Sequence, residues 1–148
     1  MSSNPAPDLE RAFAEIEACI ASGKALTRHH ARPVLICLGE QLLAGETASA
    51  AQSFRRCRDL TSKAPGTWGS AVRDELLMAS TEHVRSVDPR WLDHPTYDFE
   101  YTVAARAALE ARLRAARDLG FELSPDLEAN VARADGILAQ HLARRRPR

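Results

Sequence analysis

Residues 88–101, with the sequence DPRWLDHPTYDFEY, divide the chain into two helical parts and so decide its expected fold. Pro89 and Pro95 interrupt any helix that enters this stretch, because proline lacks the amide hydrogen and clashes with the preceding turn. Proline is tolerated at the first position of a helix, so each of the two can also begin one. We therefore expect one helical turn over residues 89–93 and a long helix over residues 96–119. Gly120 should end that helix in the left-handed conformation typical of helix C-termini.

Five other segments have apolar residues at helical spacing. Their expected starts are residues that favour the N-cap or the first helical position, namely Asp8, Pro33, Thr47, Ser70 and Ser124. Gly23 and Gly45 are expected to end the first two helices. Residues 64–69, APGTWG, have the composition of a loop. Helices joined by such short connections predict an all-α fold, a single-domain bundle of about six helices over residues 8–143.

The second of these helices is expected to lie at the centre of the bundle, because its run VLICLGEQLL at residues 34–43 is apolar almost all round. On the long helix, the inner face is expected to include Tyr101 and Ala105. The side chains expected to be buried are Phe13, Ile16, Leu38, Leu42, Leu76, Leu109, Leu113, Val131 and Leu138. Residues 1–7 and 144–148 are expected to lie outside the bundle, as a disordered N-terminus and a basic tail.

The charge balance limits the classes of partner. Twenty basic residues match twenty acidic ones, whereas a dedicated nucleic-acid binder has a basic excess. Residues 24–63 nevertheless carry a net charge of +4 and residues 74–100 one of −5, a separation that is usual for solvated faces but can also steer a charged partner. No apolar run is long enough to span a membrane, and the N-terminus lacks the features of a signal peptide. We expect a cytoplasmic protein without a membrane partner.

Motifs for catalysis or metal binding are missing from the sequence. The five histidines do not show the i, i+3 or i, i+4 ligand spacing of a helical metal site. Neither a P-loop nor a dinucleotide-binding glycine pattern occurs. Cys19, Cys37 and Cys57 each fall in an apolar helical pattern, so we expect free thiols, as in a reducing compartment. We therefore expect a protein that is not an enzyme and that holds no cofactor and no metal.

The stretch 88–101 is the candidate binding surface, because it carries half of the chain's eight aromatic residues and four acids against one base. Aromatic side chains anchor interfaces, and acids steer a basic partner towards them. We expect a basic patch on a partner protein to bind Asp88, Trp91, Asp93, Tyr97, Asp98, Glu100 and Tyr101. The alternative is a tight connection whose aromatic residues lie in the core. Phe99 and Tyr101 point about 200° apart on one helix, so at least one of them should be in the core.

Three segments carry a resemblance to a known family. Residues 84–89, VRSVDP, end a helix, residues 97–104, YDFEYTVA, open the next one, and residues 34–43 contain the run EQLL. Over about half of the chain the sequence resembles small all-helical immunity proteins that neutralise toxins delivered by type VI secretion, while residues 121–148 add a helix to that pattern. The resemblance implies a soluble, non-enzymatic protein that binds and occludes a cognate toxin in the cytoplasm of the producing cell.

The sequence also leaves a second class of function open. A regulatory helical domain that binds nucleic acid or a small ligand has the same general composition. A basic patch that includes Arg55, Arg56 and Arg58 is the part of the sequence that favours nucleic acid. The oligomeric state is open as well, since a homo-oligomer is compatible with either class.

Overall fold

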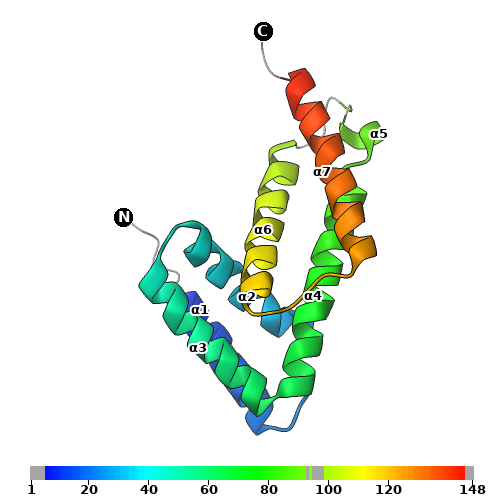
Figure 1. Cartoon of the computed structure of the whole chain (residues 1–148). Coiled ribbons are helices and arrows are strands. Elements are labelled where there is room, and N and C mark those ends of the chain that lie inside the picture. The colour runs from blue at the N-terminus through cyan, green and yellow to red at the C-terminus, as the bar shows by residue number, and fades with distance from the viewer. Residues whose placement is uncertain (1–5, 93, 95–98, 146–148) are drawn as a thin grey trace.

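The computed structural model describes residues 6–92, 94 and 99–145, and the regular structure in those residues is entirely helical (Figure 1). In chain order the elements are α1 (Ala6–Ala21), α2 (Arg28–Leu43), α3 (Thr47–Lys63), α4 (Pro65–Ser86), α5 (Pro89–Leu92), α6 (Phe99–Asp118) and α7 (Pro125–Arg145). Six of them are long helices, and α5 is a four-residue turn. This confirms the predicted all-α bundle. None of the described helices is long and apolar enough to cross a membrane.

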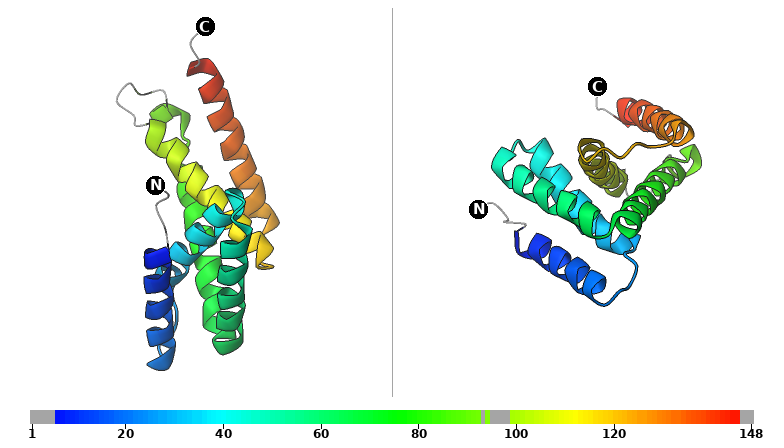
Figure 2. Two further views of the ribbon diagram at one scale, coloured as in Figure 1. Left: turned by 90° about the vertical axis from the view of Figure 1, so that its left-hand side faces the viewer. Right: turned by 60° about the horizontal axis from the view of Figure 1, so that its bottom comes forward.

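The helix α2 lies at the centre of the bundle, as predicted. It packs against α1, α3, α4 and α6 (Figures 1 and 2), and Val34, Leu35 and Leu38 are completely buried. The last helix, α7, packs mainly against α4 and runs antiparallel to α6 (Figure 1). The bundle is therefore built as one group of helices around α2, with α7 added along the other side of α4.

The prediction that Pro33 begins the second helix was wrong, because α2 begins at Arg28 and contains Pro33. The backbone N–H of Thr27 donates a hydrogen bond of 3.0 Å to Nδ1 of His30, and the Thr27 hydroxyl lies 3.1 Å from the same nitrogen. His30 thus takes the role of the glutamate in a capping box. With this cap the helix begins at Arg28 instead of Pro33. The stabilisation from the cap outweighs the loss of the backbone hydrogen bond that Pro33 cannot donate.

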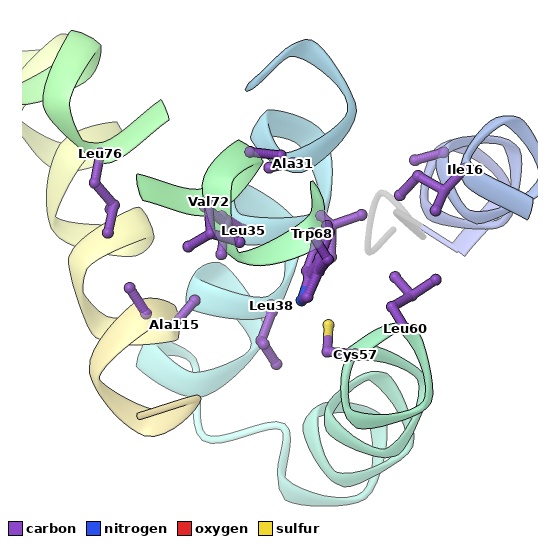
Figure 3. Packing of buried hydrophobic residues seen from close by; sticks show 14 of the residues in the cluster. Ile16, Ala31, Leu35, Leu38, Cys57, Leu60, Trp68, Val72, Leu76 and Ala115 are labelled. Carbon is purple, nitrogen blue, oxygen red and sulfur yellow. The ribbon is translucent and has the colours of Figure 1, made fainter. Parts of the chain in front are cut away.

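The prediction that residues 64–69 form a loop was also wrong, because α4 begins at Pro65. Trp68, in the middle of this stretch, has an exposed fraction of 0%. In Figure 3 it lies among side chains of α2 and α3, beside Leu38 and Cys57. Proline at the first helical position loses no hydrogen bond. Burial of the large indole side chain outweighs the low helix propensity of the neighbouring glycines.

Burial follows the predicted faces except at the start of α6. Eight of the nine side chains predicted to be buried are buried, and Leu42 is half-buried. Tyr101, placed on the inner face by its spacing, is 70% exposed, so that prediction was wrong. Phe99 instead packs against a small second core of Val87, Leu92, Ala134 and Leu138. The start of α6 faces α7 and the end of α4, and the side that carries Phe99 is therefore the buried one.

The predicted C-terminal end of the long helix and the predicted start of the last helix are confirmed, whereas the predicted start of the long helix at residue 96 lies outside the described residues. Gly120 has a φ of +90° directly after α6, the left-handed conformation that glycine adopts without steric cost. Ser124 caps α7, since its Oγ accepts a hydrogen bond of 3.2 Å from the backbone N–H of Leu127. Residues 121–124 therefore form a short connection that reverses the chain between α6 and α7.

The close approach of α2 to α6 depends on Gly39. A Cβ atom at this position would lie only 1.8 Å from the backbone carbonyl oxygen of Ala111 in α6. The two backbones are therefore in direct contact, and α6 is buried almost all round at this level, at Ala111, Arg112, Leu113, Ala115 and Ala116.

We predict that Gly39→Ala lowers the free energy of unfolding by about 3 kcal/mol or more, because the atoms in its way belong to a backbone that cannot rotate aside. Gly136→Ala in α7 is the matched control, since a Cβ atom there meets nothing within 4 Å. It should stabilise the protein by about 0.5–1 kcal/mol through helix propensity. Urea unfolding followed by circular dichroism measures both values. Equal stabilities of the two variants would contradict the direct backbone contact.

Candidate functional site

The stretch predicted as a binding surface is described only in part. Asp93, Tyr97 and Asp98 lie outside the described residues, and of Trp91 only the backbone, in α5, is described. Asp88 is half-buried and accepts hydrogen bonds of 2.9 Å from both the backbone N–H and the side-chain NH2 group of Arg90. These bonds lower the pKa of Asp88. Asp88 therefore has a structural role at the start of α5.

Glu100 and Tyr101, the last two residues of the predicted surface, are both exposed. Tyr101 leaves 70% of its surface accessible, which is unusual for a side chain of this size. Its neighbour Phe99 turns inward and lies 5.1 Å, centroid to centroid, from the ring of His141 in α7. Of the two aromatic residues, Phe99 is therefore half-buried against the second core and Tyr101 lies at the surface.

Two further exposed apolar side chains lie on α6 and α7, on a side of α6 about 200° away from Tyr101. Val103 is 41% exposed and Leu142 is 39% exposed. Both line a shallow groove of about 490 Å³ between α6 and α7, together with Ala107, Leu138 and Ala139 and the charged residues Arg106, Glu110 and Asp135. We call Glu100, Tyr101, Val103 and Leu142 the α6–α7 surface. It combines an aromatic residue, aliphatic residues and an acid, the composition of an interface centre with a polar rim.

Three helices are joined beneath this groove by a charged network. Asp135 of α7 accepts hydrogen bonds of 2.6 and 2.8 Å from Nε and NH2 of Arg106 in α6. It also lies 2.8 Å from Nε2 of the buried His83 in α4. Partial burial acts to raise the pKa of Asp135, but the hydrogen bonds from Arg106 and His83 outweigh it, and the pKa is lowered. Asp135 is therefore a carboxylate, and Nε2 of His83 must be the donor to it.

A second charged group lies inside the bundle, around Glu75 of α4. Its carboxylate is only 2% exposed. One oxygen lies 3.8 Å from Nε of Arg112 in α6 and the other 3.8 Å from the guanidinium of Arg28 in α2. Burial raises the pKa of Glu75, although Arg112, Arg32 and Arg28 act against this increase. Burial lowers the pKa of Arg112 for the same reason, since it disfavours the charged form of either group. These separations exceed hydrogen-bond distance, so the pairs are held by charge rather than by direct hydrogen bonds.

The sequence analysis did not predict this charged group, although the positions of Glu75 and Arg112 in the sequence indicate it. Glu75 follows Val72 by three residues, and Arg112 follows Leu109 by three, so both fall on the apolar faces of their helices. A charged residue at a position that faces the core is seldom buried without a partner. The sequence could not show that these two face each other, because that depends on how α4 and α6 pack.

A pocket of about 300 Å³ opens beside these groups, between α2, α4 and α6. Its lining residues are Arg32, Ala79, Glu82, His83, Ser86, Tyr101, Ala104, Ala105, Ala108 and Arg112. Tyr101 lines this pocket but is not among the residues that line the groove between α6 and α7. Over the parts of the chain that the structure describes, no three histidine, cysteine or acidic side chains are grouped to hold a metal ion.

Some of the basic residues of the segment 24–63 are engaged within the protein. Arg56 forms an ion pair with Glu10, and its guanidinium lies 3.9 Å from the centroid of the Phe13 ring. Lys63 lies 3.3 Å from a carboxylate oxygen of Glu17. A nucleic-acid phosphate would have to compete with these contacts.

Neither a scan against protein-family models nor searches of the curated proteins and of the solved structures found a match for this chain. The function is therefore inferred from the surfaces and the pocket described above.

Cys57 is predicted to be the least reactive thiol of the native protein. Burial raises its pKa to about 12, and only the thiolate is a good nucleophile. Cys19 and Cys37 are half-buried. Labelling with iodoacetamide at pH ~8 should therefore modify Cys57 more slowly than the other two, and mass spectrometry of the digested protein gives the three rates. Unfolding in urea should make the rates similar. Fast labelling of Cys57 in the folded protein would contradict its burial.

Removal of Arg112 should destabilise the fold more than removal of Arg28, although both lie 3.8 Å from Glu75. Arg112→Met leaves a buried carboxylate without its buried partner, and we expect a loss of about 3–5 kcal/mol. Arg28→Met removes a side chain that is 30% exposed, and the expected loss is under about 1 kcal/mol. Addition of Glu75→Gln to Arg112→Met should recover part of the loss. Chemical unfolding tests this series, and equal losses for the two arginines would contradict it.

Proposed function

We propose that this chain is a non-enzymatic binding protein of the immunity type, which occludes a cognate protein toxin in the cytoplasm of the producing cell. The observation that carries the proposal is the 70% exposure of Tyr101 next to Glu100 at the start of α6. A large aromatic side chain at the surface gains free energy when a partner covers it, and tyrosine is among the residues enriched at interface hot spots. The resemblance of residues 97–104 to immunity proteins supports the same interpretation.

The surroundings of Tyr101 fit a partner interface. Val103 and Leu142 are further exposed apolar residues at this end of the molecule, on the groove side of α6 and α7. Two exposed acids lie near Tyr101. Glu100 precedes it in the sequence, and Glu82 lines the same pocket. The partner's complementary face should therefore offer an apolar recess rimmed by lysine or arginine. Since the α6–α7 surface belongs to helices fixed by the Arg106–Asp135 pair, binding should need little rearrangement.

Nucleic-acid binding is the less favoured alternative. The formal net charge is zero, and members of the basic segment are already paired with Glu10 and Glu17. Neutralisation of several phosphates needs a surplus of free basic side chains on one face. Small-ligand binding is favoured by a separate observation, the pocket beside Arg112, and is compatible with a protein partner at the α6–α7 surface.

The test uses the protein encoded by a toxin-like reading frame next to this gene. Tyr101→Ala should weaken binding by about 2–4 kcal/mol, mainly through faster dissociation. Glu100→Lys should mainly slow association and reduce its dependence on salt. Leu43→Ala is the matched control, since Leu43 is 53% exposed at the far end of α2, and its effect should stay below about 0.5 kcal/mol. Surface plasmon resonance at several salt concentrations separates these effects, and a growth assay measures protection.

The proposal fails if folded Tyr101→Ala and Glu100→Lys both bind and protect like the wild-type protein. It also fails if the purified chain neither binds the neighbouring gene product nor protects cells that produce it. Binding of duplex DNA or of RNA by the wild-type chain, with a steep dependence on salt, would favour the nucleic-acid alternative instead.

A further inference from the structure

We propose that the pocket between α2, α4 and α6 binds a small zwitterion, a molecule that carries both a carboxylate and a protonated amine. This site shares only Tyr101 with the α6–α7 surface, and it does not depend on the proposed toxin. Its charged side chains come from three helices, with Arg32 on α2, Glu82 and His83 on α4, and Arg112 on α6. They therefore surround the pocket rather than lining one side of it.

The arginines of α2 and α6 supply the part of the pocket that favours a carboxylate. Arg112 is 6% exposed, and its buried Nε has no hydrogen-bond partner among the described residues. Glu75 compensates part of its charge from 3.8 Å. Arg32 and Arg28 lie close enough to Glu75 to act on its pKa, so the group of three guanidiniums and one carboxylate has a surplus positive charge. A planar guanidinium with free N–H groups matches the geometry of a carboxylate.

The α4 side of the pocket offers acceptors instead of donors. Glu82 is exposed and forms no ion pair with any other residue that the structure describes. His83 is 3% exposed, and its Nδ1 is buried without a hydrogen-bond partner in the same part of the chain. In the tautomer that carries its proton on Nε2 and donates it to Asp135, Nδ1 is an acceptor. An ammonium group satisfies both acceptors, since it has three N–H donors and a positive charge.

Because the pocket has arginines on one side and acceptors on the other, it should bind poorly any ligand that carries charges of only one sign. A polyanion such as a nucleoside triphosphate meets the repulsion of Glu82, and a polyamine meets Arg32 and Arg112. A zwitterion places a group of the right charge on each side. The uncharged lining residues are Ser86, Tyr101 and four alanines, Ala79, Ala104, Ala105 and Ala108, and the small alanine side chains leave space for a short aliphatic chain. The volume of about 300 Å³ is at the lower limit of small-molecule sites, so the ligand should have the size of an amino acid.

The experiment uses the full chain and a panel of defined probes. The zwitterions are the twenty standard amino acids, β-alanine and 4-aminobutyrate, and the singly charged controls are butyrate and butylamine. Thermal unfolding at concentrations up to about 10 mM should show an increased Tm with at least one zwitterion, because ligands that bind only the folded state stabilise it. Isothermal titration calorimetry then gives the Kd of the best probe.

Two exposed residues allow the site to be tested without disturbing the core. Arg32→Gln and Glu82→Gln should each raise the Kd of that probe about tenfold or more, the typical effect of losing one hydrogen bond to a charged group. The matched controls are Arg55→Gln on α3 and Glu15→Gln on α1, which are exposed and outside the pocket, and their Kd values should equal that of the wild type.

Three results would overturn the proposal. The first is that no zwitterion of the panel stabilises the wild-type chain. The second is that butyrate or butylamine binds as well as the best zwitterion. The third is that the control substitutions weaken binding as much as Arg32→Gln and Glu82→Gln do. The failure of the toxin-binding test changes none of these outcomes, since no partner protein is present.

Discussion

The contact between Gly39 of α2 and the backbone of Ala111 in α6 is the constraint on which the rest of the structure depends. A methyl group would lie 1.8 Å from the carbonyl oxygen of Ala111, so only glycine allows these helices to touch backbone to backbone. Their close packing puts α2 at the centre, where α1, α3 and α4 also contact it. It also brings Arg112, next to Ala111 in the sequence, to a buried position opposite Glu75 of α4. A wider separation of α2 and α6 would expose this pair to water.

Charge pairs add to apolar contacts in joining the second half of the molecule. Asp135 of α7 is held by Arg106 of α6 and His83 of α4, and among the described residues the apolar cluster at this end consists of Val87, Leu92, Ala134 and Leu138 with a few neighbours. Oriented hydrogen bonds define a geometry more narrowly than apolar contacts do, because both the distances and the angles matter. The groove between α6 and α7 and the pocket between α2, α4 and α6 therefore have fixed walls on which binding residues can be placed.

The two proposed sites share Tyr101. Its exposed ring belongs to the α6–α7 surface, and it also lines the pocket that contains Arg32, Glu82 and Arg112. A partner that covers Tyr101 would also cover one side of the pocket. Ligand and partner would then affect each other's binding, and thermodynamic linkage requires such an effect to be reciprocal. The proposed variants separate the sites, since Glu100 contributes to the α6–α7 surface alone and Arg32 to the pocket alone.

The sequence by itself determined the helical class, the short turn at α5, the end of α6 at Gly120 and most of the core, because helical periodicity and the conformational freedom of glycine are local properties. Only the tertiary structure decided that Trp68 lies in the core, that Phe99 packs against the second core while Tyr101 is exposed, and that Arg32, Glu82, His83 and Arg112 meet at one pocket. Each of these outcomes depends on which face of one helix meets another. The spacing of residues fixes the faces of a helix, but the free energy of packing, summed over distant segments, selects the face that is buried.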